Sequence, residues 1–167
     1  MTTTRTDGAS VASRRGITIE RTYKADIADV WALWTTKDGF ESWWGPEGFR
    51  VEVHTLEARV GGALRYDMIA DAPQQIEAMK RMGQPISHKT HSTFTELTPR
   101  ERLVLTHVID FLPGVPPYES IIVAEFFQSG SSVRMVVTLR PMHNDEFTRM
   151  SVEGFTSQLT KLDKRFG

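Results

Sequence analysis

The sequence predicts an α+β fold in which a curved, seven-stranded antiparallel sheet wraps around one long C-terminal helix. Seven segments alternate apolar and polar side chains with the period of two that is typical of strands. After Pro141, apolar residues recur every three or four positions, as on one face of an amphipathic helix. Two short apolar helices are expected directly after the first strand. The predicted order is therefore one strand, two helices, six strands and a helix.

The first strand and the two short helices are predicted from residues 17–44. Residues 17–23 alternate as a strand does, and Asp26 then begins a helix as its N-cap, with Asp29 three positions later as in a capping box. The second helix begins at Lys37 and ends before Gly45-Pro46. Apolar residues mark one face of each helix: Ile27, Val30, Trp31 and Trp34 on the first, and Phe40, Trp43 and Trp44 on the second.

Short turns separate the six later strands, which favours an antiparallel meander. These strands are expected at 49–54, 64–68, 88–97, 102–111, 119–128 and 132–140. The closing helix carries its apolar residues at Phe147, Met150, Gly154, Phe155, Leu159, Leu162 and Phe166. Because glycine weakens a helix, we expect Gly154 to mark a close crossing with the sheet, where a Cβ atom would collide.

An insertion at 70–87 separates the third and fourth strands. Pro73 favours a helix start, and Gly83 followed by Pro85 favours its end. Met79 and Met82 lie at the apolar edge of this helix, and flexible methionines suit a surface that adapts to varied apolar shapes. The helix is therefore interpreted as a lid over a ligand cavity or, alternatively, as a surface excursion or a homodimer contact.

Composition excludes several classes of function. The 167 residues carry 20 Lys and Arg against 21 Asp and Glu, so no basic block is available for nucleic acid or an anionic membrane. The absence of cysteine removes disulfides, thiol nucleophiles and Cys-based zinc sites. No apolar run approaches the ~20 residues of a membrane span. We expect a cytoplasmic protein with a disordered tail at 1–15 and a single domain at 16–167.

Four ordered stretches carry a family resemblance. They are DVWALWTTKDGFESWWGPEGF (29–49), EARVGGALRYDM (57–68), ELTPRERLVLTHV (96–108) and EGFTSQLTKL (153–162). Together they resemble the activator of heat-shock-protein-90 ATPase homologue family, which belongs to the START-like helix-grip superfamily (SRPBCC). The resemblance covers about 17–165 and implies the helix-grip fold. That scaffold hosts different functions, so the resemblance leaves the activity open.

A single helix crossing a curved sheet is expected to leave a cavity lined by apolar side chains. His107 shares strand parity with Leu103 and Leu105 and should point inward, with Glu125 facing it from the next strand. Burial should keep His107 neutral. The predicted ligand-binding residues are Trp34, Trp44, Tyr66, Met68, Met79, Met82, His107, Glu125, Met150 and Phe155.

The sequence supports three hypotheses for function. The first is binding of a small hydrophobic or amphipathic ligand in the cavity, without catalytic residues, cofactor or metal. The second is a polyketide cyclase or dehydratase, which relatives in the superfamily suggest, with His107 moving a proton. The third is interaction with a chaperone, suggested by the family name alone. No nucleophile elbow, dinucleotide fingerprint or phosphate-binding loop is present.

Overall fold

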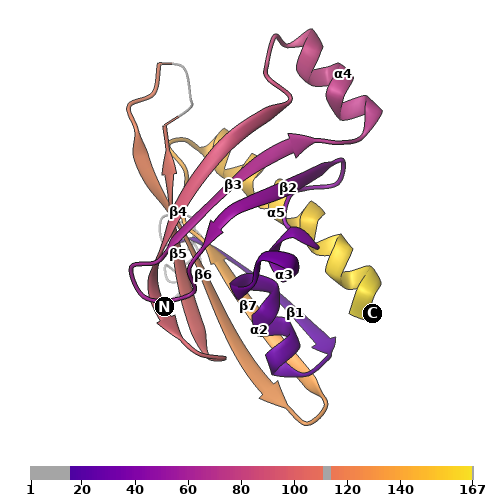
Figure 1. The fold of residues 1–167 in the computed structure, drawn as a ribbon, viewed down its shortest axis with the longest axis vertical. Helices are drawn as coiled ribbons and strands as arrows, with labels where there is room; N and C mark the ends of the chain where they lie inside the picture. Colours follow the sequence, from indigo (N-terminus) through magenta and orange to yellow (C-terminus); the bar gives the residue numbers. More distant parts are fainter. Residues whose placement is uncertain (1–15, 111–113, 167) are drawn as a thin grey trace, which may run out of the picture.

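The computed structural model describes residues 16–110 and 114–166 (Figure 1). The predicted tail at 1–15 and the last predicted position of the fifth strand, Phe111, lie outside the described residues. The strands are β1 (Ile17–Lys24), β2 (Phe49–Leu56), β3 (Ala63–Ala70), β4 (Ser87–Thr98), β5 (Arg102–Ile109), β6 (Tyr118–Ser129) and β7 (Ser132–Leu139). The helices are α2 (Ile27–Thr35), α3 (Lys37–Glu41), α4 (Pro73–Arg81) and α5 (Asp145–Phe166).

The seven strands form one antiparallel sheet in the order β1-β7-β6-β5-β4-β3-β2. β2 to β7 follow one another as a meander, and β1 completes the sheet beside β7. The turn between β6 and β7 is tight: Ser129 pairs with Ser132, and Gly130 has a φ of 59°. The predicted helix-grip fold is confirmed.

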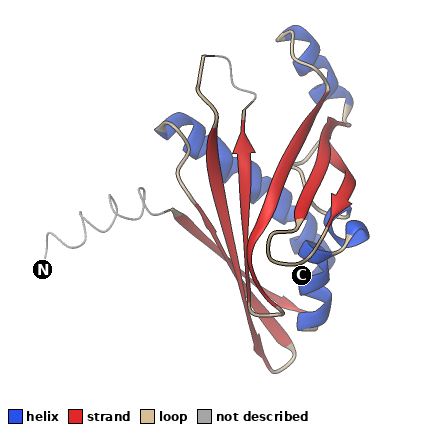
Figure 2. Ribbon diagram, turned by 60° about the vertical axis from the view of Figure 1, so that its left-hand side comes forward, coloured by secondary structure: helices blue, strands red, loops and turns tan. Residues whose placement is uncertain are grey.

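The long helix α5 lies across one face of the curled sheet (Figure 2). Phe155, Leu159 and Leu162, spaced by four and three positions, are buried in the core between helix and sheet. Where a strand contributes several residues to the core, they are two positions apart, such as Leu103 and Leu105 of β5. The face toward α5 is called the inner face below, and the opposite face the outer face.

The tryptophans of α2 and of the turn after α3 pack in the core at the end of the sheet covered by α2 and α3. Trp34 and Trp43 are fully buried, with ring centroids 5.2 Å apart. α3 is shorter than predicted, since it ends at Glu41, and Trp43 and Trp44 follow it in a turn. Asp26 is the N-cap of α2, but its side chain makes no capping hydrogen bond, so the predicted capping box does not form.

The prediction for Gly154 is wrong. Among residues 16–110 and 114–166, a Cβ atom at this position would have no heavy atom within 4 Å apart from its own stretch of helix, so the glycine is not required for a close crossing. The helix presents the row through Phe155, Leu159 and Leu162 to the sheet, whereas Met150 is 52% exposed. Gly154 therefore lies beside the packed row of α5.

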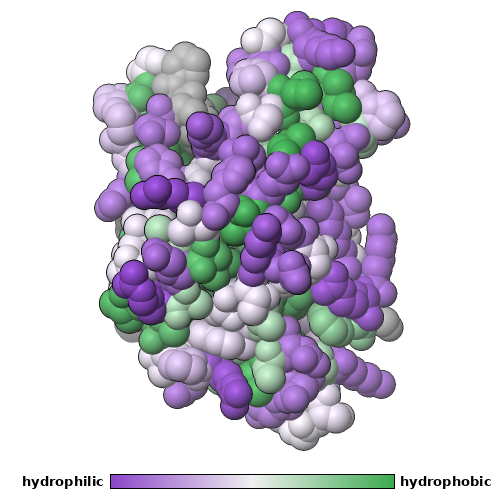
Figure 3. All heavy atoms as spheres, in the orientation of Figure 1, coloured by the Kyte–Doolittle hydropathy of each residue, from purple (hydrophilic) through white to green (hydrophobic). Residues whose placement is uncertain are grey.

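The insertion forms the predicted helix, α4, with Pro73 in its first turn. Gly83, with a φ of 69°, follows the C-cap residue Met82. The loop before α4 is fixed by two backbone hydrogen bonds, from the amides of Asp71 and Ala72 to the carbonyl of Gly48. α4 itself has no buried residue and projects from one end of the molecule (Figure 1). Apolar surface gathers in this region (Figure 3), and Met82 and Ile86 are its exposed large apolar residues.

Candidate functional site

His107 is a buried polar residue on the inner face of β5. The alternation of β5 places its side chain on the same face as Leu103 and Leu105, which are fully buried. His107 is 6% exposed, and its ring centroid lies 6.5 Å from that of Trp44. The predicted inward orientation of His107 is therefore what the structure shows.

One ring nitrogen of His107 is hydrogen-bonded and the other is not. Nδ1 forms a short hydrogen bond with Oγ of Ser92, the residue opposite His107 on β4. Nε2 is buried and, among the described residues, has no partner. Burial lowers the pKa of His107 to about 4, so the ring is neutral at pH 7. Depending on the tautomer, Nε2 can donate or accept one hydrogen bond.

A second polar group lies beside this histidine. Trp44 Nε1 donates a hydrogen bond of 3.0 Å to the hydroxyl of Tyr66. Burial raises the pKa of Tyr66 to about 12, so this hydroxyl remains protonated. Strand register connects the two groups, because Tyr66 pairs with Thr90 on β4, two residues before Ser92.

The helix side of the core also carries an unpartnered polar atom. Gln158 of α5 is 4% exposed, and its Oε1 accepts a hydrogen bond of 3.0 Å from the backbone amide of Gly45. Nε2 of the same amide is buried without a partner among the described residues. Gly45 directly follows Trp44, so the helix side chain and the aromatic cluster meet at this turn.

The predicted pair of His107 and Glu125 does not form. Glu125 lies opposite Arg102 in the register of β5 and β6, and its carboxylate is 3.1 Å from the Arg102 guanidinium. Arg102 and His107 are five positions apart on one strand, so they face opposite sides of the sheet. Glu125 is therefore on the outer face, in an ion pair that has no contact with the buried histidine.

The other predicted ligand residues differ in burial: some lie in the core and others at the surface. Trp34 is fully buried and donates from Nε1 to the sulfur of Met135, and Phe155 packs 5.8 Å from the Trp44 ring. Met68 is partly buried against the core. Met79 is half-buried, whereas Met82 and Met150 are exposed. The structure thus brings together Trp34, Trp44, Tyr66, His107 and Phe155.

The sequence prediction did not include Thr90, Ser92 and Gln158. A signal was available for each. Thr90 and Ser92 share parity with Phe94, a core residue of the same strand, and Gln158 is three positions after Phe155 on the packed row of α5. Polar residues at positions where the strand or helix pattern places buried side chains are therefore candidates for a binding site.

Among residues 16–110 and 114–166, no cluster of three His, Asp or Glu side chains has a geometry suited to a metal ion. Within the same residues, no helix is long and apolar enough to cross a bilayer.

Comparisons with known proteins agree with the fold. The profile of the family described as Activator of Hsp90 ATPase homolog 1-like protein matches residues 24–167. The crystal structure of a protein from Chromobacterium violaceum matches this chain with a TM-score of 0.69 and 23% sequence identity. The match covers 91% of this chain and 96% of the other. The AHSA1 protein from Silicibacter pomeroyi has a TM-score of 0.69 and 21% identity over 89% and 95%. A search of curated proteins gives no significant match.

Proposed function

Because this chain belongs to the Activator of Hsp90 ATPase homolog 1-like family, whose fold is consistent with hydrophobic ligand binding, we propose that it binds a small, mainly apolar molecule between the inner face of the sheet and α5. The unpartnered Nε2 of His107 is the observation that supports this proposal most directly. A buried polar atom without a hydrogen bond is costly, and a ligand that supplies one offsets that cost.

The surroundings of His107 define the ligand's chemistry. Trp44 and Phe155 provide apolar ring surface, while the hydroxyl of Tyr66 already accepts a hydrogen bond from Trp44. The ligand therefore needs an apolar body and one hydroxyl or carbonyl group directed at His107. The amide of Gln158 is a second contact for a ligand long enough to reach α5.

A catalytic role has less support. A general base works best with a pKa near the operating pH, and burial holds the pKa of His107 far below 7. Its Nδ1 partner is a serine hydroxyl and not a carboxylate that would raise its basicity. The cyclase or dehydratase hypothesis therefore lacks an activated base in this cluster, and the chaperone hypothesis still rests on the family name alone.

The role of α4, the cellular location and the domain bounds remain predictions from the sequence. Met79 on α4 and Met82 at its C-cap suit either a lid or a contact between two copies of the chain, and the absence of buried residues in α4 is compatible with both. A cytoplasmic location and a single domain at 16–167 are likewise expectations from the sequence.

A matched pair of probes tests the proposed binding. We expect 2-naphthol to bind about tenfold more tightly than naphthalene, because only the hydroxyl can pair with His107 Nε2, whichever tautomer is present. Isothermal titration on wild type and His107→Leu should show this preference only in wild type. His54→Leu is the control, since this histidine is exposed on the outer face. Failure of both probes to bind, or the same preference in His107→Leu, would refute the proposal.

A further inference from the structure

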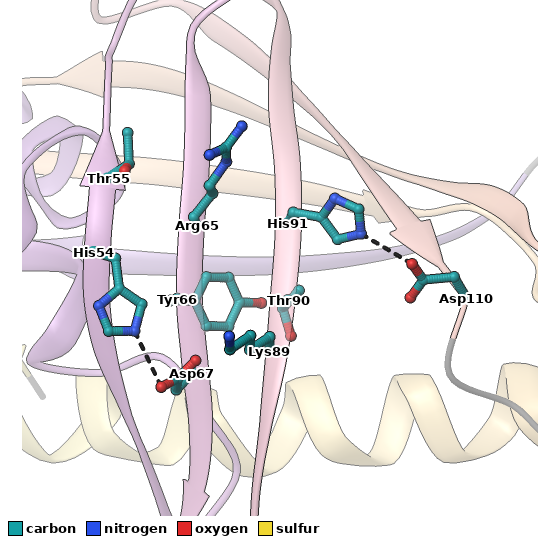
Figure 4. A pocket seen from close by; sticks show the side chains of 9 residues that line it. All are labelled: His54, Thr55, Arg65, Tyr66, Asp67, Lys89, Thr90, His91 and Asp110. Carbon is teal, nitrogen blue, oxygen red and sulfur yellow. Dashed lines mark hydrogen bonds and ion pairs between the residues drawn. The ribbon is translucent and has the colours of Figure 1, made fainter.

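A polar hollow of about 860 Å³ lies over β2 to β5 (Figure 4). Arg65 and Asp67 alternate with Leu64 and Tyr66, whose side chains are buried in the core, so the two charged residues belong to the outer face. The hollow is therefore separated by the sheet from the interior around His107. Its lining residues are His54, Thr55, Arg65, Tyr66, Asp67, Lys89, Thr90, His91 and Asp110.

Two cationic side chains and one carboxylate oxygen in this hollow have no partner among the described residues. Arg65 and Lys89 are exposed and make no ion pair or side-chain hydrogen bond with any residue of 16–110 or 114–166. Asp67 places Oδ2 3.0 Å from Nε2 of His54, but its Oδ1 is buried and unpartnered among the same residues. The hollow thus offers two free cations beside one carboxylate oxygen that needs a donor.

Strand register places these groups around one point. Asp67 of β3 is directly opposite Lys89 of β4, and Arg65 is directly opposite His91. Arg65 and Lys89 are thus diagonal neighbours, about 7–8 Å apart and somewhat closer at their Cβ atoms, within reach of long side chains. Figure 4 shows Lys89 extending from β4 toward β3, and Arg65 rising on the other side of Tyr66. Tyr66 lies between the two cationic groups in this view, so an anion above the backbone of Tyr66 and Thr90 contacts both of them once these long side chains turn toward it.

Two histidine–carboxylate pairs flank this point. His54 pairs with Asp67 on one side, and His91 Nε2 lies 3.2 Å from Asp110 Oδ2 on the other. These pairs leave Arg65 and Lys89 as the groups free to bind an anion.

We propose that this hollow binds a small phosphate monoester that also carries an ammonium or hydroxyl group. A phosphate dianion balances the charges of Arg65 and Lys89, and the guanidinium fork suits two phosphate oxygens. Asp67 lies across from Lys89, and its carboxylate accepts a hydrogen bond from the donor of the ligand by turning the now buried Oδ1 toward the hollow. This site is independent of the ligand proposed for the inner face.

Three probes test the proposal by NMR titration of the labelled full chain. They are phosphoethanolamine, ethyl phosphate, which lacks the donor, and ethanolamine, which lacks the phosphate. We expect saturable shifts at the amides of β3 and β4 with phosphoethanolamine, and about tenfold weaker binding of ethyl phosphate. Absence of saturable shifts, or shifts scattered over all basic residues, would overturn the proposal.

Charge variants assign the roles of individual residues. Arg65→Gln and Lys89→Gln should each weaken phosphoethanolamine binding about tenfold. The matched control is Arg134→Gln on β7, whose side chain is exposed and pairs with Glu20, and it should change binding less than twofold. Asp67→Asn should weaken phosphoethanolamine and not ethyl phosphate. An equal loss of phosphoethanolamine affinity in Arg134→Gln would show that general surface charge, and not this site, binds the phosphate. Tighter binding of both phosphates to Asp67→Asn would show that Asp67 does not accept a hydrogen bond from the ligand.

Discussion

The buried, neutral His107 predicts a specific loss of stability in acid. Burial lowers its pKa from 6.5 to about 4 in the folded chain, while the unfolded chain keeps the ordinary value. The unfolded state therefore binds the proton first as the pH falls, which favours unfolding. The contribution of His107 is complete above pH 6.5 and is lost as the pH falls toward 4.

The size of the effect follows from the shift. A difference of this size between the folded and unfolded pKa values corresponds to about 3 kcal/mol, of which about 2 kcal/mol is lost between pH 7 and pH 5. His107→Gln removes the titrating ring. We therefore expect the free energy of unfolding of wild type, relative to this variant, to fall by about 2 kcal/mol over that interval.

Urea denaturation at pH 7, 6 and 5 measures this difference directly. Leu105→Ala is the control, because it removes a fully buried neighbour of His107 on the same strand without changing a titratable group. Its difference from wild type should stay constant with pH. A constant difference for His107→Gln, or an NMR titration that gives His107 a pKa of 6.5 or higher, would refute the reasoning.

Three further predictions concern packing, an internal hydrogen bond and α4. Gly154→Ala should raise the free energy of unfolding, measured by calorimetry, by up to about 1 kcal/mol, because the added methyl group meets no described side chain or strand. Gly39→Ala should lower it by about 1–3 kcal/mol, because its Cβ would lie 2.1 Å from a backbone oxygen. Trp44→Phe should cost about 1–2 kcal/mol in urea denaturation, and less in a Tyr66→Phe background where the same hydrogen bond is already absent. If α4 is a lid, replacing residues 73–83 by a short Gly-Ser linker should speed ligand release without changing the association state. If α4 is instead a contact between two copies of the chain, the same replacement should convert a dimer to a monomer and leave the release rate unchanged.

Periodicity was sufficient to predict the elements of this fold. Strands such as β2 and β3 expose one face and bury the other, so their alternation is visible in the sequence. The proline and glycine that flank α4 likewise indicated its start and end. Such local signals do not depend on which segments pack together.

The pairing of side chains between strands was harder to predict. Glu125 follows four consecutive apolar residues, 121–124, of which the adjacent Val123 and Ala124 are both buried, so alternation does not say which side it takes. Register with Arg102 decides its side, and that register depends on the connection between β5 and β6. His107 was predictable because its own strand neighbours, Leu103 and Leu105, fix its face.

The two proposed sites use opposite faces of the same strands, and this arrangement makes them separable. On β3, the side chain of Tyr66 bonds Trp44 inside the core, while the neighbouring Arg65 and Asp67 face outward. Substitutions at these outward positions remove charges and leave the inner hydrogen bonds intact. Loss of phosphate binding in Arg65→Gln with unchanged binding of 2-naphthol would therefore establish two independent sites, and loss of both ligands together would show that the sheet couples its two faces.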